Sequence, residues 1–482
     1  MDTLKVYNEY YFGRIYRKIR RSIGLQQSVI YGNELTLEFI QSIFNSRYEG
    51  EVIDFSVEEK SLNGGLNSSI QRIQLKWKKQ KRECGNFKVF PETVIMKSVI
   101  ESFDRIKFSI EHSQSREADF YQYHLSSLLS NNNNNNKMKY PFIPIVYYSN
   151  KTYCGSFSMI LQDISSPKPS STSSSSLSTS SYILGSLAMG NQCWGIPDGV
   201  DISGYDISWI VENCFIETSK LHIDFWRDKE ILSQQQQQQQ QQQENSNNDL
   251  SWLKNLDYYN GIGKEKYINY FEIKLNNTWE KSTLPLIEKL SKENKLEHVD
   301  LYKLVVNEYF QSFIKWESFQ KRVDINQPNT PFTMVHGDFH AGNIMIPITT
   351  TTIVGKEGDE IKKNQIKKDG QIYFLDYSEV GIGCPFSDIS QFIISNCSIE
   401  FRRENEKRLF SIYYEKLIKS KKVDSNIFNF NYCFNLYKRG GIEKWIWFNI
   451  LLSEMVPEFA FIFYFNQLST FINDHYNLNL FK

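Results

Sequence analysis

The stretch MVHGDFHAGNIMI, Met334 to Ile346, places an aspartate, two histidines and an asparagine among small and apolar residues. Polar groups of this kind are costly to bury without partners, so their presence in an apolar segment indicates a functional role. Asp338 and Asn343 stand five residues apart, and Gly337 and Gly342 allow a tight backbone around them. This spacing lets a carboxylate and an amide oxygen converge on one side of a loop. The carboxylate can orient a hydroxyl group and take its proton, and the amide oxygen can bind a hard cation such as Mg²⁺.

A second acidic group follows in IYFLDYSE, Ile372 to Glu379, where Asp376 ends an apolar, strand-like run. A carboxylate held at the end of a strand is a suitable second ligand for the same cation. Between the two stretches, Pro347 to Gly370 is polar and rich in threonine and lysine, which predicts an extended hairpin loop.

The composition indicates a folded protein without a strong overall charge. The 482 residues are 40% hydrophobic and 23% charged, enough for two or more domains with cores. Lys+Arg and Asp+Glu each number 55, so we expect no general attraction to nucleic acid or to anionic membranes. The most apolar run, Met455 to Phe465, is interrupted by Pro457 and Glu458 and falls short of the ~18 residues of a membrane span. It predicts a core helix, and parts of the longer aromatic-rich stretch Trp445 to Phe465 could line an acceptor pocket. Nothing in the sequence indicates a protein partner.

The seven cysteines are scattered, odd in number and never paired as C-x-x-C. This pattern argues against a disulfide framework and a zinc site, and it favours a reducing, cytoplasmic location. Cys384, which follows Asp376 closely, is expected to be a packing residue rather than a nucleophile. The basic run Gly13 to Arg21 resembles part of a targeting segment, but Asp2 and Glu9 favour a solvated helix face.

Three low-complexity tracts interrupt the patterned sequence: Asn131–Asn136, Ser165–Ser181 and Gln234–Gln243. Such tracts cannot bury enough apolar surface to offset the entropy lost on ordering. They are therefore expected to be disordered surface insertions in loops of a folded domain.

The periodicity predicts a strand-rich part followed by a helical part. Helical spacing occurs in Leu35–Phe44 and again from Glu117, whereas Ile73–Trp77, Thr93–Val99 and Ser158–Ile164 have the pattern of strands. Beyond residue 205 the pattern is mostly helical. The expected organisation is an N-terminal extension (1–34), a strand-rich lobe (35–164), a Ser-rich insertion (165–181) and a helical lobe (182–482) with a Gln-rich insertion at 233–249.

The string HGDFHAGN followed by FLDYSE resembles the catalytic core of the aminoglycoside phosphotransferase and choline kinase superfamily, in particular its ecdysteroid-kinase-like (CHK-type) branch. The resemblance extends over about Leu35 to Leu417. It implies an α+β, bilobal, protein-kinase-like fold: a small antiparallel sheet on a larger α-helical lobe, with ATP in the cleft between them.

The resemblance also implies roles upstream of the motif. TVIMK is similar to the strand that carries the ATP-phosphate lysine, which gives Lys97 this role. READFYQY resembles the helix whose glutamate pairs with that lysine, which gives Glu117. SLNGGLNSS stands where the nucleotide-covering loop belongs, with Gly64 and Gly65, but it lacks the G-x-G-x-x-G spacing of protein kinases.

SMILQDI resembles the strand that leads into the hinge, where adenine would meet the backbone at Gln162, Asp163 and Ile164. Relatives often have an acidic pair where this chain has Gln162-Asp163. This difference concerns a contact near the adenine and no group that the chemistry needs. SKLHIDFW resembles the helix before the catalytic half, and GCPFSDISQFI supplies Asp388, which in such kinases braces the catalytic loop.

The implied reaction is transfer of the γ-phosphoryl group from Mg·ATP to a hydroxyl of a small molecule. Asp338 would position the hydroxyl, Asn343 and Asp376 would hold magnesium, and Lys97, held by Glu117, would orient the phosphates. The acceptor stays open among choline- or ethanolamine-like, sterol-like, sugar and aminoglycoside alcohols.

Structural alternatives exist for the catalytic loop and its brace. Asp338 and Asn343 could instead cap a turn. His336 and His340 could form a metal pair, although structural support of the loop is the preferred interpretation. Asp388 could be a helix N-cap, alone or together with its bracing role.

Alternatives also exist for the remaining groups and for the protein as a whole. Lys97 could be an ordinary lysine at a strand edge, and Glu117 a solvated helix charge. The protein could be a silent nucleotide-binding pseudokinase, although the retention of all five polar groups argues against this. A protein kinase is disfavoured because HGD replaces H-R-D, DYS replaces D-F-G, and no A-P-E follows Asp376.

Overall fold

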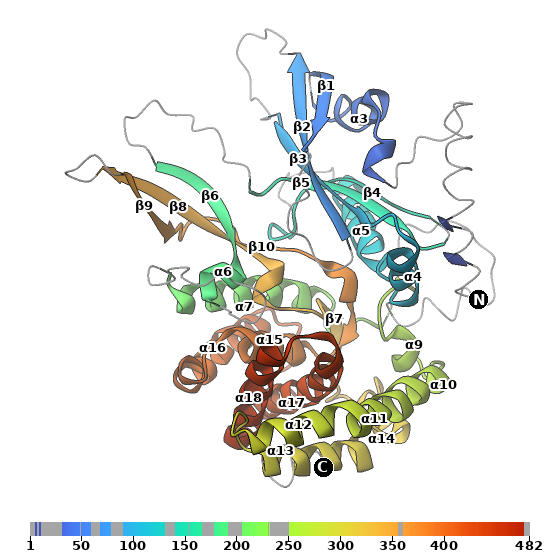
Figure 1. The fold of residues 1–482 in the computed structure, drawn as a ribbon, viewed down its shortest axis with the longest axis vertical. Helices are drawn as coiled ribbons and strands as arrows, with labels where there is room; N and C mark the ends of the chain where they lie inside the picture. The colour runs from blue at the N-terminus through green and yellow to red at the C-terminus, as the bar shows by residue number, and fades with distance from the viewer. Residues whose placement is uncertain are drawn as a thin grey trace. The chain divides into compact units, whose positions relative to one another are not determined.

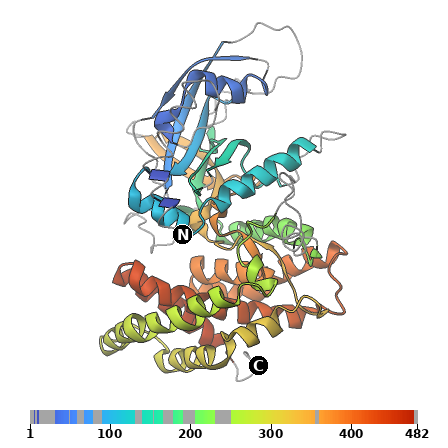
Figure 2. The same cartoon turned by 90° about the vertical axis from the view of Figure 1, so that its right-hand side faces the viewer.

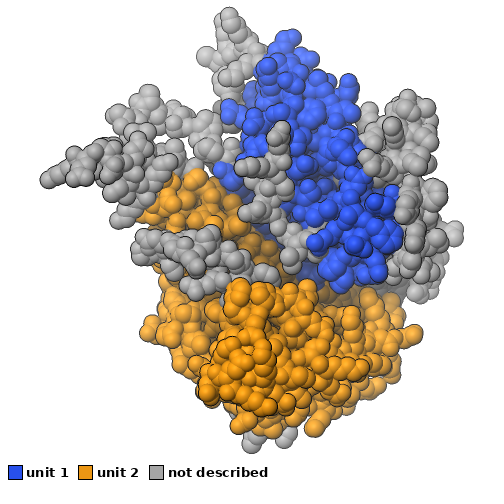
Figure 3. Space-filling view, in the orientation of Figure 1, with its two compact units in different colours: residues 1–172, 246–248, 375–379 blue, residues 173–245, 249–374, 380–482 orange. Residues whose placement is uncertain are grey.

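The computed structural model describes residues 5–6, 9–10, 31–48, 50–58, 68–78, 90–130, 140–152, 154–165, 178–190, 205–229, 231, 250–354 and 360–476. The chain divides into two compact units (Figure 3). Unit 1 comprises residues 1–172, 246–248 and 375–379, and unit 2 comprises residues 173–245, 249–374 and 380–482. The short segment Leu375–Glu379 therefore belongs to unit 1, although the chain on either side of it belongs to unit 2.

Unit 1 is built on a five-stranded antiparallel sheet (Figure 1). Its strands, in sheet order, are β1 (Glu51–Val57), β2 (Ser68–Lys78), β3 (Thr93–Val99), β5 (Phe157–Gln162) and β4 (Val146–Lys151). The central strand β3 reads TVIMKSV and is mostly buried, which explains its nearly continuous apolar run. Lys97 therefore lies on an inner strand and is not a strand-edge lysine.

Three helices accompany this sheet: α3 (Leu37–Phe44), α4 (Phe103–Glu111) and α5 (Arg116–Ser130). The hydroxyl of Thr36 accepts a hydrogen bond from the Phe39 backbone N–H and so caps α3. Phe39, Ile40 and Phe44 of this helix pack with Val52 of β1 in one apolar core. Helix α5 packs on β4 and on the segment Leu375–Glu379.

The HGD motif of unit 2 lies between two strands, β7 and β8. β7 (Thr333–Val335) pairs with β11 (Gly381–Gly383), and β8 (Ile344–Val354) pairs with β6 (Ser178–Leu184), β9 (Glu360–Ile366) and β10 (Tyr373–Phe374). The larger part of β8 and the whole of β9 lie within Pro347–Gly370, the stretch predicted to be a hairpin loop. The prediction of a disordered Ser-rich insertion through Ser181 is wrong at its end, because Ser178–Ser181 pair with Thr351–Ile348 of β8. Ser and Thr tolerate extended backbone when a neighbouring strand supplies the hydrogen bonds.

The rest of unit 2 is helical, and its long helices lie side by side in Figures 1 and 2. The helices are α6 (Gly185–Met189), α7 (Ile207–Asp224), α9 (Leu256–Tyr259), α10 (Lys264–Tyr267), α11 (Leu275–Thr278), α12 (Leu284–Lys292), α13 (Val299–Glu308), α14 (Trp316–Arg322), α15 (Pro385–Asn396), α16 (Ile399–Lys419), α17 (Phe430–Met455) and α18 (Glu458–His475). Wider π-helical turns of unit 2 occupy Ile268–Lys274, Trp279–Thr283 and Tyr309–Phe313. A 3-10 turn of unit 2 occupies Ala341–Asn343, and the 3-10 turns Gly32–Glu34 and Tyr377–Glu379 belong to unit 1.

The fold class expected from the sequence, α+β with a small antiparallel sheet and a larger helical part, is confirmed. The core helix expected over Met455–Phe465 corresponds to the first half of α18, in which Phe461, Tyr464 and Phe465 are buried, but the helix starts only at Glu458. α17 ends at Met455 and α18 begins at Glu458, because Pro457 cannot continue a helix and instead occupies the N-cap position of α18. No helix in the described part of the chain is long and apolar enough to cross a membrane.

Several sequence predictions lie outside the described residues. They are the basic run Gly13–Arg21, the nucleotide-loop glycines Gly64 and Gly65, the Asn tract Asn131–Asn136 and the Gln tract Gln234–Gln243.

Candidate active site

The HGD motif forms a loop between β7 and β8 whose backbone is held by side chains of α15. The carboxylate of Asp388 accepts hydrogen bonds from the backbone N–H groups of His336 (2.7 Å) and Gly337 (3.2 Å). The N-cap of α15 is Cys384, so Asp388 is not a helix cap. Its carboxylate braces the loop instead.

Asp388 is itself fully buried and surrounded by cationic and hydrogen-bonding groups. Nε2 of His222, on α7, lies 3.5 Å from Asp388 Oδ2, and Nζ of Lys444, on α17, lies 3.7 Å from Oδ1. Burial alone would raise the pKa of Asp388, but His222 and Lys444 outweigh it and lower this pKa to about 2. The brace is therefore ionised at neutral pH. His222 is in turn fixed by the Tyr413 hydroxyl, 2.7 Å from its Nδ1.

Two further side chains of α15 extend this support. The amide oxygen of Gln391 accepts from the backbone N–H of Phe339 at 3.2 Å, and that of Asn396 accepts from Ala341 at 3.0 Å. Asp388, Gln391 and Asn396 recur at helical spacing, so one face of α15 carries all three. The backbone of the loop is thus held along most of its length by a single helix.

The Asp338 carboxylate is surrounded by hydrogen-bond donors from side chains. Gln391 Nε2 donates to its Oδ1 at 3.2 Å, whereas Asn343 Nδ2 and His340 Nε2 lie 3.4 Å from its Oδ2. Burial would raise the pKa of Asp338, but His340 and Lys444 outweigh it and hold this pKa well below its usual range. The side chain keeps 28% of its surface exposed. Asp338 is therefore an ionised, oriented carboxylate that a ligand can reach.

The two histidines of the motif bind its own backbone. His336 Nδ1 lies 3.4 Å from the backbone N of Asp338, and His340 Nδ1 accepts from Gly342 N–H at 3.0 Å. Because Nδ1 of His340 accepts, its proton is assigned to Nε2, the atom that faces Asp338. In the described part of the chain, no group of three or more His, Cys, Asp or Glu side chains could hold a metal ion. These contacts agree with structural support better than with a histidine metal pair.

Asn343 ends the 3-10 turn Ala341–Asn343 and is almost fully buried. Its Nδ2 donates to the backbone oxygen of Asp338 at 3.0 Å as well as facing the Asp338 carboxylate. Since these contacts use the NH₂ group, the amide oxygen is the atom through which Asn343 can bind a cation.

Within unit 1, Lys97, Glu117 and Asp376 form one cluster. Lys97 Nζ lies 2.6 Å from Glu117 Oε2 and 3.3 Å from Asp376 Oδ2. The exposed fraction of the side chain is 10% for Lys97 and 2% for Glu117, so Glu117 is not a solvated helix charge. Burial alone would lower the pKa of Lys97, but Asp376 and Glu117 outweigh it and raise this pKa. Burial raises the pKa of Glu117, and Lys97 opposes that rise.

Asp376 is presented by the segment Leu375–Glu379, which is anchored on α5. The ring of Tyr377 stacks on Phe120 with centroids 3.9 Å apart, and Arg116 donates to the backbone oxygen of Ser378 at 2.5 Å. Asp376 has a φ of 58°, in the left-handed region that Asp tolerates better than most residues. These contacts fix a strained residue whose carboxylate is 32% exposed.

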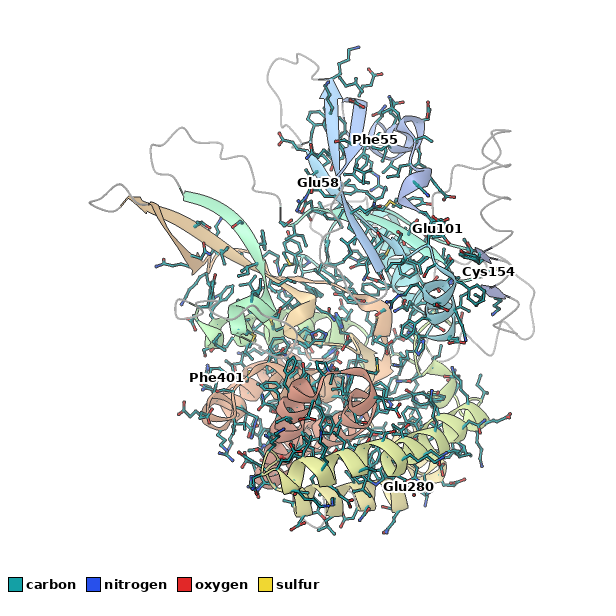
Figure 4. The ribbon with its side chains drawn as sticks, in the orientation of Figure 1. Phe55, Glu58, Glu101, Cys154, Glu280 and Phe401 are labelled. Atoms are coloured by element: carbon teal, nitrogen blue, oxygen red, sulfur yellow. The ribbon has the colours of Figure 1, made fainter. Side chains whose placement is uncertain are left out.

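The expected hinge residues use their side chains within the fold. Gln162 Oε1 accepts from the backbone N–H of Ile145 at 3.2 Å, and Asp163 accepts from Arg72 Nε at 2.7 Å. Arg72 also reaches Glu58 (labelled in Figure 4) at 3.2 Å. The side chains of Gln162 and Asp163 are thus engaged in the fold, and the backbone N–H of Gln162 also donates to the backbone oxygen of Ile145 at 2.8 Å.

Cys384 packs rather than reacts. Burial raises the pKa of its thiol to about 11, despite backbone hydrogen bonds from Phe386 and Ser387 that act in the opposite direction.

Sequence reasoning missed several residues that build the site: His222, Gln391, Asn396, Lys444, Arg116 and Tyr377. Gln391 and Asn396 could have been found by extending the helical spacing from Asp388 along FSDISQFIISN. Lys444 is about a hundred residues beyond the motif, and no local pattern connects it to the loop.

With the geometry of the loop established, comparison with known proteins is informative. The model of the ecdysteroid kinase-like family matches residues 238–423. This part of the chain is similar to that family. The matched segment contains Asp338, Asn343, Asp376 and Asp388, whereas Lys97 and Glu117 precede it. The resemblance noted from HGDFHAGN and FLDYSE is thereby confirmed.

Solved structures match over most of the chain at low identity. A choline kinase from Cryptosporidium parvum Iowa II is 12% identical, with 96% of this chain and 94% of that chain covered and a TM-score of 0.41. A GDP complex of aminoglycoside 2'-phosphotransferase-IIIa is 11% identical, with 92% and 100% covered and a TM-score of 0.40. An ethanolamine kinase from Plasmodium vivax is 10% identical, with 88% and 82% covered and a TM-score of 0.39. None of the curated protein sequences matches the chain.

Proposed function

We propose that this protein is an ATP-dependent phosphotransferase that moves the γ-phosphoryl group of Mg·ATP to a hydroxyl of a small molecule. The observation that carries the proposal is the Asp338 carboxylate, which is ionised, partly exposed and oriented by Gln391, Asn343 and His340. The ecdysteroid kinase-like match over residues 238–423 supports it.

Asp338 orients the acceptor hydroxyl toward the γ-phosphorus. Because the pKa of Asp338 is low, this carboxylate is a weak base at neutral pH. It takes the hydroxyl proton late, when the new O–P bond has largely formed, as a loose transition state requires. ADP leaves with the electrons of the broken bond, and no covalent enzyme intermediate is needed. Positioning and neutralisation of charge account for most of the rate enhancement.

Lys97 binds the α- and β-phosphates, and Glu117 holds its ammonium in place. A buried lysine with a raised pKa stays charged throughout the physiological range, which suits this role. Gly64 and Gly65 would cover the nucleotide, and the backbone of Gln162, Asp163 and Ile164 would receive the adenine.

Asn343 and Asp376 would hold magnesium. An amide oxygen and a carboxylate are hard-cation donors, and a phosphate-bound Mg²⁺ needs only one or two protein ligands. When bound, the ion would neutralise charge on the phosphates.

The acceptor is an alcohol of the choline- or ethanolamine-like, sterol-like, sugar or aminoglycoside type. The test is a panel of these four classes with Mg·ATP, in which ADP release and a phosphorylated product are followed together. Product formation with one class supports the proposal and identifies the acceptor. Failure to bind ATP at millimolar concentration, together with no product from any class, would remove it.

A further inference from the structure

Lys444 contacts the catalytic loop from a helix that no sequence motif connects to it. Its Nζ donates to the backbone oxygen of Gly337 at 2.7 Å and lies 3.7 Å from Asp388 Oδ1. The side chain is 15% exposed. A largely buried ammonium at this distance is a strong, charge-assisted donor, and its removal would leave a carbonyl and a buried carboxylate short of a partner.

The carbonyl that Lys444 binds belongs to the peptide group that precedes Asp338. The N–H of the same peptide group faces His336 Nδ1 at 3.4 Å. Gly337 has a φ of 82°, a conformation that the chain leaves readily unless both of its peptides are held. Asp388 holds the peptide on the N-terminal side of Gly337 at 3.2 Å, and Lys444 holds the one on its C-terminal side.

A glycine pair places Lys444 at this position. A Cβ on Gly441 would lie 2.9 Å from Cβ of Ser390, and one on Gly440 would lie 2.7 Å from Oγ of Ser387. The lack of a Cβ at these two positions therefore lets α17 approach α15, the helix that carries Asp388, closely. Lys444 follows them by three and four residues and so lies on the same face of α17.

We propose that Lys444 is a positioning residue for phosphoryl transfer, which fixes the Gly337–Asp338 peptide and thereby the direction of the Asp338 carboxylate. The proposal rests on the proposed function, and it assigns to α17 a part in the reaction. Because Lys444 acts through the loop, its loss should affect turnover far more than nucleotide binding.

The decisive variant is Lys444→Met, which keeps the aliphatic stem and its packing but removes the ammonium. We expect kcat to fall by about 100-fold, the scale of a small misplacement of a catalytic group, while the Kd for ATP changes less than about twofold. Lys444→Arg, which retains a cation, should recover kcat to within about tenfold of wild type. Lys438→Met, the same change elsewhere on α17, is the matched control and should leave kcat unchanged.

Hydrogen exchange of the backbone over residues 335–343 provides a readout that does not depend on activity. Lys444→Met should exchange about tenfold faster than wild type in this segment, and Lys444→Arg and Lys438→Met should not. Wild-type kcat and wild-type protection in Lys444→Met would overturn the positioning role. If the wild-type protein neither binds ATP nor transfers phosphate while the exchange difference is present, the proposed function fails, but Lys444 still fixes the Gly337–Asp338 peptide.

Discussion

Lys97 Nζ lies 2.6 Å from Glu117 Oε2 and 3.3 Å from Asp376 Oδ2, so a single ammonium pairs with two carboxylates from different parts of the chain. One of these carboxylates comes from α5, and the other comes from a segment that is 279 residues beyond Lys97 in the sequence. Within this cluster the Lys97 ammonium is held in place with little solvent around it, and an ammonium fixed in this way is a suitable partner for a polyphosphate.

Replacement of Lys97 by methionine should weaken ATP binding and destabilise unit 1. Glu117 would lose the cation that opposes the rise of its pKa on burial and would take up a proton, and loss of one partner of a buried pair costs about 3 kcal/mol or more. We expect the Kd for ATP to rise by about 10- to 100-fold, measured by calorimetry. Lys76→Met, on the exposed face of the neighbouring strand, is the control. Unchanged affinity in Lys97→Met would remove Lys97 from the nucleotide site.

Asp388→Asn should destabilise the protein in a pH-dependent manner. The folded-state pKa of Asp388 is about 2 and its ordinary value is 3.8, so its carboxylate stabilises the folded state above about pH 4. This contribution is lost as the pH falls through about 2. The difference in unfolding free energy between wild type and Asp388→Asn should therefore shrink by about 2 kcal/mol from pH 7 to pH 2.

Urea unfolding followed by tryptophan fluorescence measures this difference, since all tryptophans except Trp77 fall within the residue ranges of unit 2. Asp369→Asn, at an exposed turn, should show almost no difference from wild type at any pH. A gap between wild type and Asp388→Asn that does not vary with pH would mean that the charge of Asp388 is not what stabilises the loop.

Gly441→Ala should be more destabilising than Gly440→Ala. The added methyl of Gly441→Ala meets the Ser390 Cβ at 2.9 Å and the Ile394 Cδ1 at 3.0 Å, and the Ser390 Cβ is fixed by its backbone and cannot turn aside. The methyl of Gly440→Ala meets only the Ser387 hydroxyl, which can rotate. Alanine gains about 1 kcal/mol of helix propensity over glycine, whereas overpacking costs about 1–3 kcal/mol. Thermal unfolding should place Gly441→Ala below wild type and Gly440→Ala near it. The opposite order would contradict the close approach of the two helices.

Much of the fold could be predicted from local patterns. Thr93–Val99 alternates little because β3 is an inner strand, and it was the resemblance of TVIMK to the lysine-bearing strand of the family that singled out Lys97. The HGD motif and Asp376 could be recognised because the residues of each loop stand together in a short string of sequence. The Ser-rich strand β6 escaped prediction because its order comes from pairing with β8, which lies far away in the sequence.

The supporting residues of the site could be predicted only in part. Asp388 carried a motif, but Gln391 and Asn396 revealed their role only when the face of α15 was known. The position of Lys444 depends on the crossing of α17 and α15, which two glycines permit. A glycine pair inside a long helix indicates close packing, but the sequence does not show which helix packs there. The assignment of Leu375–Glu379 to unit 1 follows from tertiary contacts with α5 and has no local signature.

The catalytic role of Asp338 is tested most directly by the rate of acceptor-dependent ADP release from Mg·ATP by the wild type, by Asp338→Asn and by Asp369→Asn. Asn keeps the size of the side chain but cannot accept the hydroxyl proton. We expect Asp338→Asn to lose at least about 1,000-fold in kcat while it binds ATP as the wild type does, and we expect Asp369→Asn to be unaffected. An Asp338→Asn protein that phosphorylates its acceptor at the wild-type rate would contradict the assignment of Asp338 and with it the proposed mechanism.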